Sequence, residues 1–82
     1  MDRHFLAVHP IAGGWTVETG VTGPLMFLSG ADAERAARAL AAGFAKAGED
    51  ATVSVSDRRG AIIGTINYHP PGAEPRREAR RA

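Results

Sequence analysis

Three histidines, His4, His9 and His69, are the only imidazole groups in this chain of 82 residues. Together with Asp2 or Asp57 they are the candidate ligands for a metal ion. His4 and His9 stand an odd number of residues apart on one expected strand, so they should point to opposite faces. Neither histidine has the helical i, i+4 partner that zinc proteases use. We therefore interpret the histidines as structural or solvated and expect no metal site and no cofactor.

Nucleophilic catalysis has little support in this sequence. Cys is absent, which excludes disulfides, thiolate metal sites and cysteine nucleophiles. The serines fall at an expected helix start, Ser29, and on the polar face of an expected strand. No G-x-S-x-G, phosphate loop or G-x-G-x-x-G occurs, and the glycines stand at turns. The sequence therefore predicts no catalytic residues and favours a protein that is not an enzyme.

Arginines offer candidate contacts to phosphate groups. Residues 1–68 carry six basic and seven acidic side chains, so this part of the chain is near neutral and predicts no broad basic face. Solvated arginines are the favoured interpretation, and nucleic-acid binding is the alternative. That alternative predicts an affinity that falls steeply with salt. The candidate contacts are two arginines at an expected hairpin tip, Arg58 and Arg59, and four in the C-terminal segment, Arg76, Arg77, Arg80 and Arg81.

Two aromatic residues are ambiguous between core packing and ligand contact. Trp15 is the only tryptophan and begins an expected strand after two glycines, and Tyr68 ends the last expected strand. Core packing is favoured for Trp15, because large aromatic side chains bury much apolar area. Tyr68 carries a hydroxyl group that needs a partner or water.

Length and composition indicate one small globular domain. The chain is 44% hydrophobic and 23% charged, and its length allows one modest core. No apolar run approaches the roughly 20 residues of a membrane span. The acidic residue near the N-terminus speaks against an export signal, so we expect a cytoplasmic protein without a membrane partner. We predict a domain over residues 1–68 and a flexible tail rich in Pro and Arg over residues 69–82.

Short strands and one helix must position these residues. Apolar runs and turn residues predict strands over 4–9, 15–19 and 25–28, with Pro10 ending the pairing of the first. Ser29 and Asp32 approximate a capping box that starts a helix ending near Gly48. The expected apolar stripe of this helix is Ala33, Ala37, Leu40, Phe44 and Ala47, and Glu34 and Arg38 should pair one turn apart.

Two further strands complete the predicted fold. Ala51, Val53 and Val55 alternate with polar residues, which indicates a half-buried strand. Residues 57–60 have the composition of a type I turn, and residues 61–68 return as the hairpin partner. The sequence thus predicts an α+β fold of order β-β-β-α-β-β, an antiparallel sheet with one alanine-rich helix packed on one face.

Apolar residues on both faces of several strands exceed what one helix can cover. In the first strand Phe5 and Ala7 oppose Leu6 and Val8, and Ile62 is followed by another isoleucine in the last. This surplus predicts a homodimer, formed through the open face of the sheet or through an edge strand.

The sequence also resembles a family of short bacterial proteins. A strand that ends in Val8-His9-Pro10 is followed by Gly13-Gly14-Trp15-Thr16-Val17, a helix, a turn at Gly60 and a closing Tyr68. In this order the chain resembles the domain of unknown function 2188 family over roughly residues 4–68. The resemblance implies the order of elements, with the glycines and Trp15 as a structural fingerprint, and no catalytic residues.

These observations favour a small, non-enzymatic binding or interaction module that self-associates. The first alternative is a weak nucleic-acid-binding accessory protein that uses the hairpin tip and the tail. The second alternative is a small-molecule or metal-dependent enzyme, which requires a pocket that the sequence does not reveal.

Overall fold

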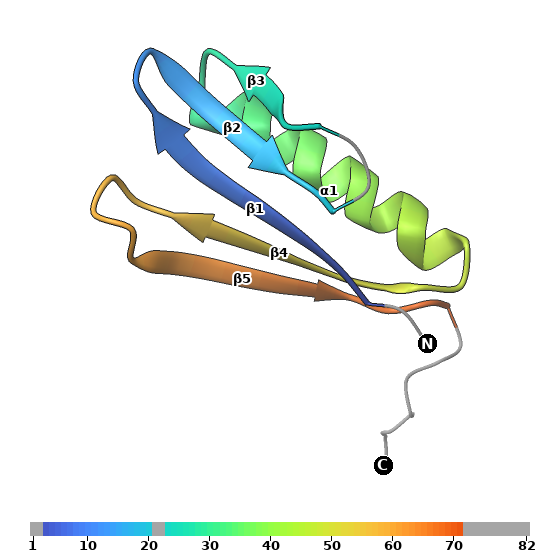
Figure 1. The fold of residues 1–82 in the computed structure, drawn as a ribbon. Helices are drawn as coiled ribbons and strands as arrows, with labels where there is room; N and C mark the ends of the chain where they lie inside the picture. The colour runs from blue at the N-terminus through green and yellow to red at the C-terminus, as the bar shows by residue number, and fades with distance from the viewer. Residues whose placement is uncertain (1–2, 21–22, 72–82) are drawn as a thin grey trace.

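The structure, a computed structural model, describes residues 3–20 and 23–71 and consists of a five-stranded sheet with one helix across one of its faces (Figure 1). The expected α+β class and the expected order of strands and helix are confirmed. In chain order the elements are β1 (Arg3–Ile11), β2 (Gly14–Glu18), β3 (Leu25–Phe27), α1 (Gly30–Lys46), β4 (Asp50–Ser56) and β5 (Ile62–Tyr68).

The sheet is mixed, which corrects the expectation of a purely antiparallel sheet. Its strand order is β3-β2-β1-β4-β5, and the central pair, β1 and β4, is parallel. The helix causes this, because α1 carries the chain from the end of β3 back to the end of the sheet where β1 begins. Strand β4 therefore starts beside the start of β1, with Arg3 opposite Asp50 and Val8 opposite Val55.

Strand β1 continues through Pro10, where we expected its pairing to end. Pro10 lies opposite Trp15 in the antiparallel ladder with β2, and the strand ends at Ile11. The pairing of β1 with β4 stops at Val8, so Pro10 has a neighbouring strand on one side only. A missing backbone N–H is tolerated where a strand has such an unpaired edge.

Helix α1 begins and ends as its sequence predicts. The Ser29 hydroxyl accepts a hydrogen bond from the backbone N–H of Asp32 at 3.1 Å, and the extended backbone of Ser29 makes it the N-cap. At the other end Gly48 has a φ of +93°, a conformation that glycine adopts without strain. Glu34 and Arg38 form the expected ion pair, with 3.4 Å between Oε1 and Nη2.

The first turn of α1 provides a pH-dependent prediction. A hydrogen bond from Arg35 to Asp32 Oδ1, at 2.7 Å, and one with Ser29 hold the pKa of Asp32 below its ordinary value. A lowered folded pKa means that this carboxylate stabilises the fold above its unfolded pKa of about 3.9 and loses that effect as the pH falls through the folded value. We expect R35A to raise the pKa of Asp32, measured by NMR titration, and R38A to leave it unchanged. Equal Asp32 pKa values in wild type and R35A would contradict this.

The buried face of α1 consists only of alanine. Leu40, expected in the apolar stripe, is exposed, and Phe44 is half-buried, which corrects that part of the prediction. Small side chains at every fourth position let the helix backbone lie close to the sheet, and a larger residue on this line would hold it away. The buried residues are Ala33, Ala37, Ala41 and Ala45.

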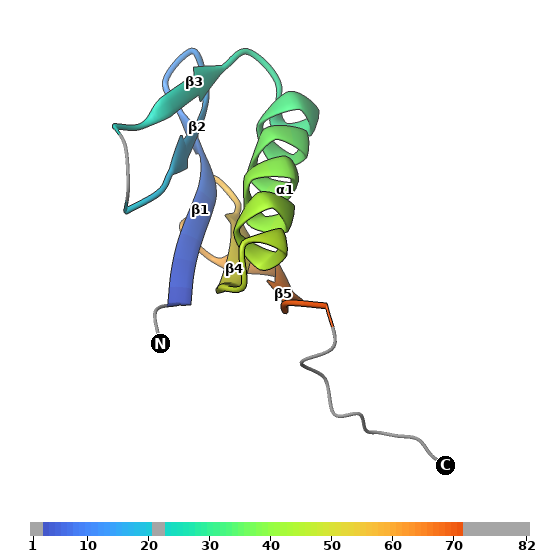
Figure 2. The same ribbon diagram turned by 90° about the vertical axis from the view of Figure 1, so that its right-hand side faces the viewer.

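The core lies between these alanines and one face of the sheet (Figure 2). Its largest fully buried side chains come from the three central strands and are Leu6, Val8, Val17 and Val53. Because side chains alternate along each strand, this arrangement leaves every second residue of β1 and β4 on the face away from the helix.

Candidate functional site

The face of the sheet opposite α1 is uncovered within the part of the chain that the structure describes, and we call it the open face. The register of the paired strands shows which residues lie on this face. Those of β1 are Arg3, Phe5, Ala7, His9 and Ile11, those of β2 and β3 are Gly14, Thr16, Glu18 and Met26, and those of β4 and β5 are Asp50, Thr52, Ser54, Ser56, Ile62, Thr65 and Asn67.

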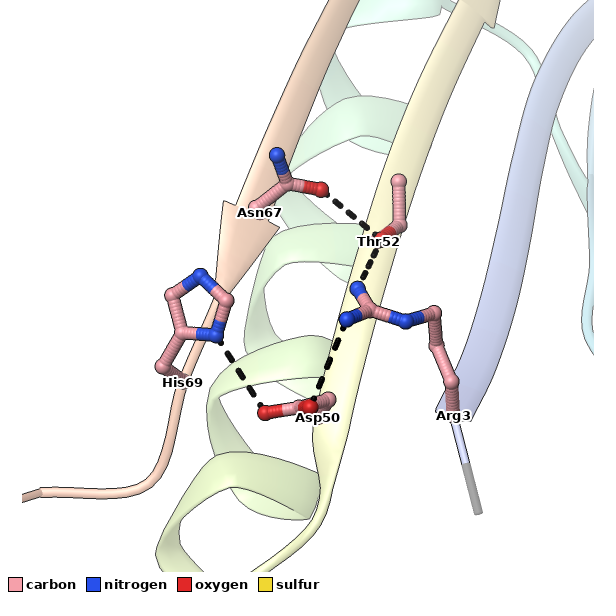
Figure 3. A network of polar contacts seen from close by, with 5 residues as sticks. All are labelled: Arg3, Asp50, Thr52, Asn67 and His69. Atoms are coloured by element: carbon pink, nitrogen blue, oxygen red, sulfur yellow. Dashed lines mark hydrogen bonds and ion pairs between the residues drawn. The ribbon is translucent and has the colours of Figure 1, made fainter. Parts of the chain in front are cut away.

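A polar network occupies one end of the open face (Figure 3). The Arg3 guanidinium donates to Thr52 Oγ1 at 3.2 Å and forms an ion pair with Asp50 Oδ2 at 3.4 Å. Thr52 in turn donates to Asn67 Oδ1 at 2.8 Å. His69 Nδ1 lies 3.2 Å from the second oxygen of Asp50. The network therefore links β1, β4, β5 and the residue just beyond β5.

Phe5 lies on the open face beside this network. It is on β1, the central strand, and 64% of it is exposed. Its cross-strand neighbours are Thr52 on β4 and, beyond it, Asn67 on β5. An aromatic ring is thus presented to solvent with hydrogen-bonding groups beside it.

Each histidine lies beside a carboxylate. His4, on the helix side, approaches Glu49 Oε1 at 2.6 Å and stacks on the Phe44 ring with 3.8 Å between centroids. His9, on the open face, lies 3.5 Å from Glu18 Oε1. His4 and His9 therefore point to opposite faces, as their spacing predicts. Within residues 3–20 and 23–71, no three His, Asp or Glu side chains gather where they could hold a metal ion.

The candidate arginines fall in two groups, of which the structure describes one. Arg58 and Arg59 are exposed in the turn before β5, which Asp57 closes by accepting the backbone N–H groups of Arg59 and Ala61. The turn thus has the predicted form, and Gly60 has a φ of +85°. The chain leaves the opposite end of β5 toward the C-terminus. The other four candidates, Arg76, Arg77, Arg80 and Arg81, lie outside the described residues, as does most of the predicted tail.

Trp15 and Tyr68 face the helix side of the sheet. Both are partly buried against the core, in agreement with the packing role expected for Trp15. The indole lies over the first residue of α1, since a Cβ on Gly30 would stand 3.0 Å from two atoms of the Trp15 ring. These aromatic side chains are therefore placed away from the open face.

Large apolar side chains are also exposed at both edges of the sheet. Ile62 and Ile63 are each 64% exposed on β5, where a register shift sets two residues of β5 against one of β4. Met26 and Leu28 are exposed at the β3 edge. Together with Ile11 and neighbouring glycines, Met26 and Leu28 line a shallow hollow of about 230 Å³. None of its lining residues has a titratable side chain.

Sequence reasoning identified the exposed apolar residues but missed the polar network. Alternation along β1 indicated that Phe5 and Leu6 lie on opposite faces. Nothing local indicated that Arg3, Asp50 and His69 meet, because 47 residues separate Arg3 from Asp50 and their contact follows from the parallel pairing.

Comparison with known proteins adds no relative. No family model matches the chain, and neither a curated protein nor a solved structure matches it. In the described part of the chain, α1 is too short and too polar to cross a membrane.

Proposed function

We propose that the protein is a small, non-enzymatic interaction module that acts as a homodimer, with strand β5 pairing with β5 of a second copy. The composition of this edge strand is the observation that carries the proposal. Its seven residues, from Ile62 to Tyr68, include no Lys, Arg, Asp, Glu or Pro. Those are the residues with which proteins protect an exposed edge from pairing with another chain.

The two edges of the sheet differ in this respect. Strand β3 has only three residues, and a short edge strand offers few free backbone groups. Strand β5 has seven, most of them exposed, and two adjacent isoleucines lie at its start. Pairing of β5 would therefore bury apolar side chains and satisfy backbone N–H and C=O groups at the same time.

Pairing of β5 with its own copy is antiparallel about a twofold axis normal to the sheet. Overlap of all seven residues sets Thr65 opposite Thr65 of the second copy. The sheet would then continue from one protomer to the other, with both helices on the same side. Such an interface is closed and leaves no further β5 edge for growth.

Other expectations are part of the same proposal. We retain the resemblance to the domain of unknown function 2188 family, which contributes no catalytic residue. A bacterial cytoplasmic location is proposed because a chain without Cys needs no oxidising compartment. A non-enzymatic role is part of the proposal because the sequence contains no Cys and none of the catalytic motifs sought above.

I63K tests the dimer. Burying one isoleucine contributes about 1.5 to 3 kcal/mol, and a symmetric dimer loses two, so we expect the dimer dissociation constant to rise at least about a hundredfold. The measurement is molecular mass by light scattering or sedimentation over a wide concentration range. L28K is the matched control, because it puts the same charge at the opposite edge of the sheet, at a residue that is 90% exposed.

A second measurement checks the register. The chain has no Cys, so T65C introduces a single thiol. Opposite residues in an antiparallel pair lie within the Cα separation that a disulfide requires. We expect T65C to form a disulfide-linked dimer on mild oxidation, and L28C to do so far more slowly. A wild-type mass of one chain at every concentration would refute the proposal.

A further inference from the structure

A hollow of about 170 Å³ lies between α1 and β5, on the helix side of the sheet, and we call it the β5 hollow. The helix packs chiefly on β1 and β4 and only slightly on β5, so it leaves this edge strand partly uncovered. One wall of the hollow is the ion pair of α1, and the rest is apolar. The lining residues are Glu34, Arg38, Val55, Ile63, Gly64 and Ile66.

Gly64 is the reason that the hollow exists. It lies opposite the buried Val55 in the β4–β5 ladder and therefore faces the helix side. A Cβ at Gly64 would meet no described atom within 4 Å. A glycine within a strand leaves a gap of this kind, and a side chain from the neighbouring strand can pack over it. The β5 hollow therefore has room for a side chain from a strand that pairs with the β5 edge.

Pairing of β5 with its own copy supplies such a side chain. In the register centred on Thr65, Gly64 lies opposite Ile66 of the second copy. A twofold axis normal to the sheet keeps the same face of both copies on one side, so this isoleucine also points to the helix side. It would lie over Gly64, beside the exposed Ile63.

Neighbouring registers fill the β5 hollow less well. A register centred on Gly64 sets two glycines opposite each other and leaves the gap of both copies empty. A register centred on Ile66 sets Gly64 opposite Tyr68 of the second copy, but the Tyr68 side chain already packs against the core of its own chain. Only the register centred on Thr65 sets a large aliphatic side chain over each glycine.

The charges at the two ends of β5 suit an antiparallel copy. Strand β5 has no charged residue, and the one charged residue of β4 is Asp50, at its start. At the opposite end, Arg58 and Arg59 are exposed in the turn and have no ion pair among the described residues. Antiparallel pairing sets the turn of one copy beside the Asp50 end of the other and keeps the two arginine pairs apart. A parallel neighbour would instead bring like charges together.

We propose that the β5 hollow is the binding site for the Ile66 side chain of a second copy, so that each protomer covers the Gly64 of the other. This inference rests on the β5 pairing of the proposed function and adds the side chain and the site that determine its register. It also gives a reason for self-recognition. An edge strand without a large aliphatic residue at this position would leave the hollow empty.

I66A tests the contribution of this side chain. The substitution removes about three carbon atoms from each of the two sites, so we expect the dimer dissociation constant to rise at least about tenfold. The measurement is sedimentation over a wide concentration range. L28A is the matched control, because it removes the same number of carbon atoms from a residue that is 90% exposed at the opposite edge.

The effect of I66A on the single protomer is measured separately, because Ile66 also lines the hollow of its own chain. Comparison of I63K/I66A with I63K by thermal unfolding gives that effect in a background that does not dimerise. We expect the double variant to fold, since Ile66 is only half-buried.

Cysteine pairs test the position of Ile66 directly. The chain has no Cys, so G64C and I66C each carry a single thiol. In the proposed site these thiols lie opposite each other in a mixed dimer, whereas two copies of one variant place them on a diagonal about 7 to 8 Å apart, too far for a disulfide. We expect an equimolar mixture to form the mixed disulfide on mild oxidation faster than either variant links to itself. Mass spectrometry separates the three products.

The outcomes distinguish this inference from the proposed dimer. A wild-type chain that stays monomeric at every concentration would refute both. A wild-type dimer that I63K dissociates, but whose dissociation constant is the same in I66A, would leave β5 pairing standing and overturn the Ile66 site. A mixed disulfide that forms no faster than the two symmetric ones would overturn it as well.

Discussion

Replacement of Ala37 by leucine is expected to destabilise the protein by about 3 kcal/mol, the upper part of the range for overpacking a core. Ala37 is fully buried at the middle of the alanine line of α1. Three additional carbon atoms would have to fit between the helix backbone and the valines of β1 and β4. The melting temperature should fall by roughly 12 to 24 °C, since a domain of this size shifts about 4 to 8 °C per kcal/mol. Thermal and chemical unfolding followed by circular dichroism provide the measurement.

A39L is the control for this prediction. It makes the same substitution in the same helix at an exposed residue, where a surface change is usually within about 0.5 kcal/mol. The contrast between A37L and A39L separates packing from helix propensity. Equal melting temperatures for the two variants would show that the helix does not lie against the sheet through its alanines.

Replacement of Gly14 by alanine is expected to have an effect of similar size. A Cβ at Gly14 would stand 2.4 Å from the carbonyl oxygen of Phe27, which is backbone and cannot rotate away. Strand β3 would have to move off β2, and we expect a loss of about 2 to 3 kcal/mol. Trp15, the only tryptophan, lies opposite Phe27 in the same ladder. Its fluorescence emission should therefore shift to longer wavelength in G14A.

G20A is the control for this second substitution. A Cβ at Gly20 meets no atom within 4 Å, and its φ is not in the left-handed region. We expect its stability and its Trp15 emission to match those of wild type. Wild-type stability in G14A would contradict the close approach of β3 to β2. The two glycines of this turn therefore differ in role, because Gly13 has the positive φ whereas Gly14 leaves space for the backbone of β3.

Local chemistry accounts for the elements that the sequence predicts well. Ser29 and Gly48 bracket the helix because cap residues act on the backbone within one turn. Apolar and polar residues alternate in the strand from Asp50 to Ser56, because one of its faces is buried and the other is not. Asp57 and Gly60 determine the turn that follows. Each of these predictions depends on residues within a few positions of one another.

Predictions that depend on neighbours distant in the sequence succeeded less well. The apolar stripe of α1 was predicted from spacings of three and four, which included Leu40 and Phe44, but the sheet approaches the line of alanines that continues through Ala41 and Ala45. Pro10 remains within its strand because β4 stops short of it. Both outcomes depend on the position of another element of the fold, and the local sequence pattern does not indicate that position.

The amino-acid sequence by itself determined the elements of this protein, their order, and the surplus of apolar residues beyond what one helix covers. Capping, turn chemistry and alternation are local, and they required no knowledge of the partner strands. Only the tertiary structure decided which residues meet. Parallel pairing of β1 with β4 brings Arg3 to Asp50 beside Phe5, antiparallel pairing of β4 with β5 adds His69, and the position of β5 at the edge exposes its backbone. Arg3 and Asp50 are 47 residues apart in the sequence, so the polar network and the candidate surfaces exist only in the folded chain.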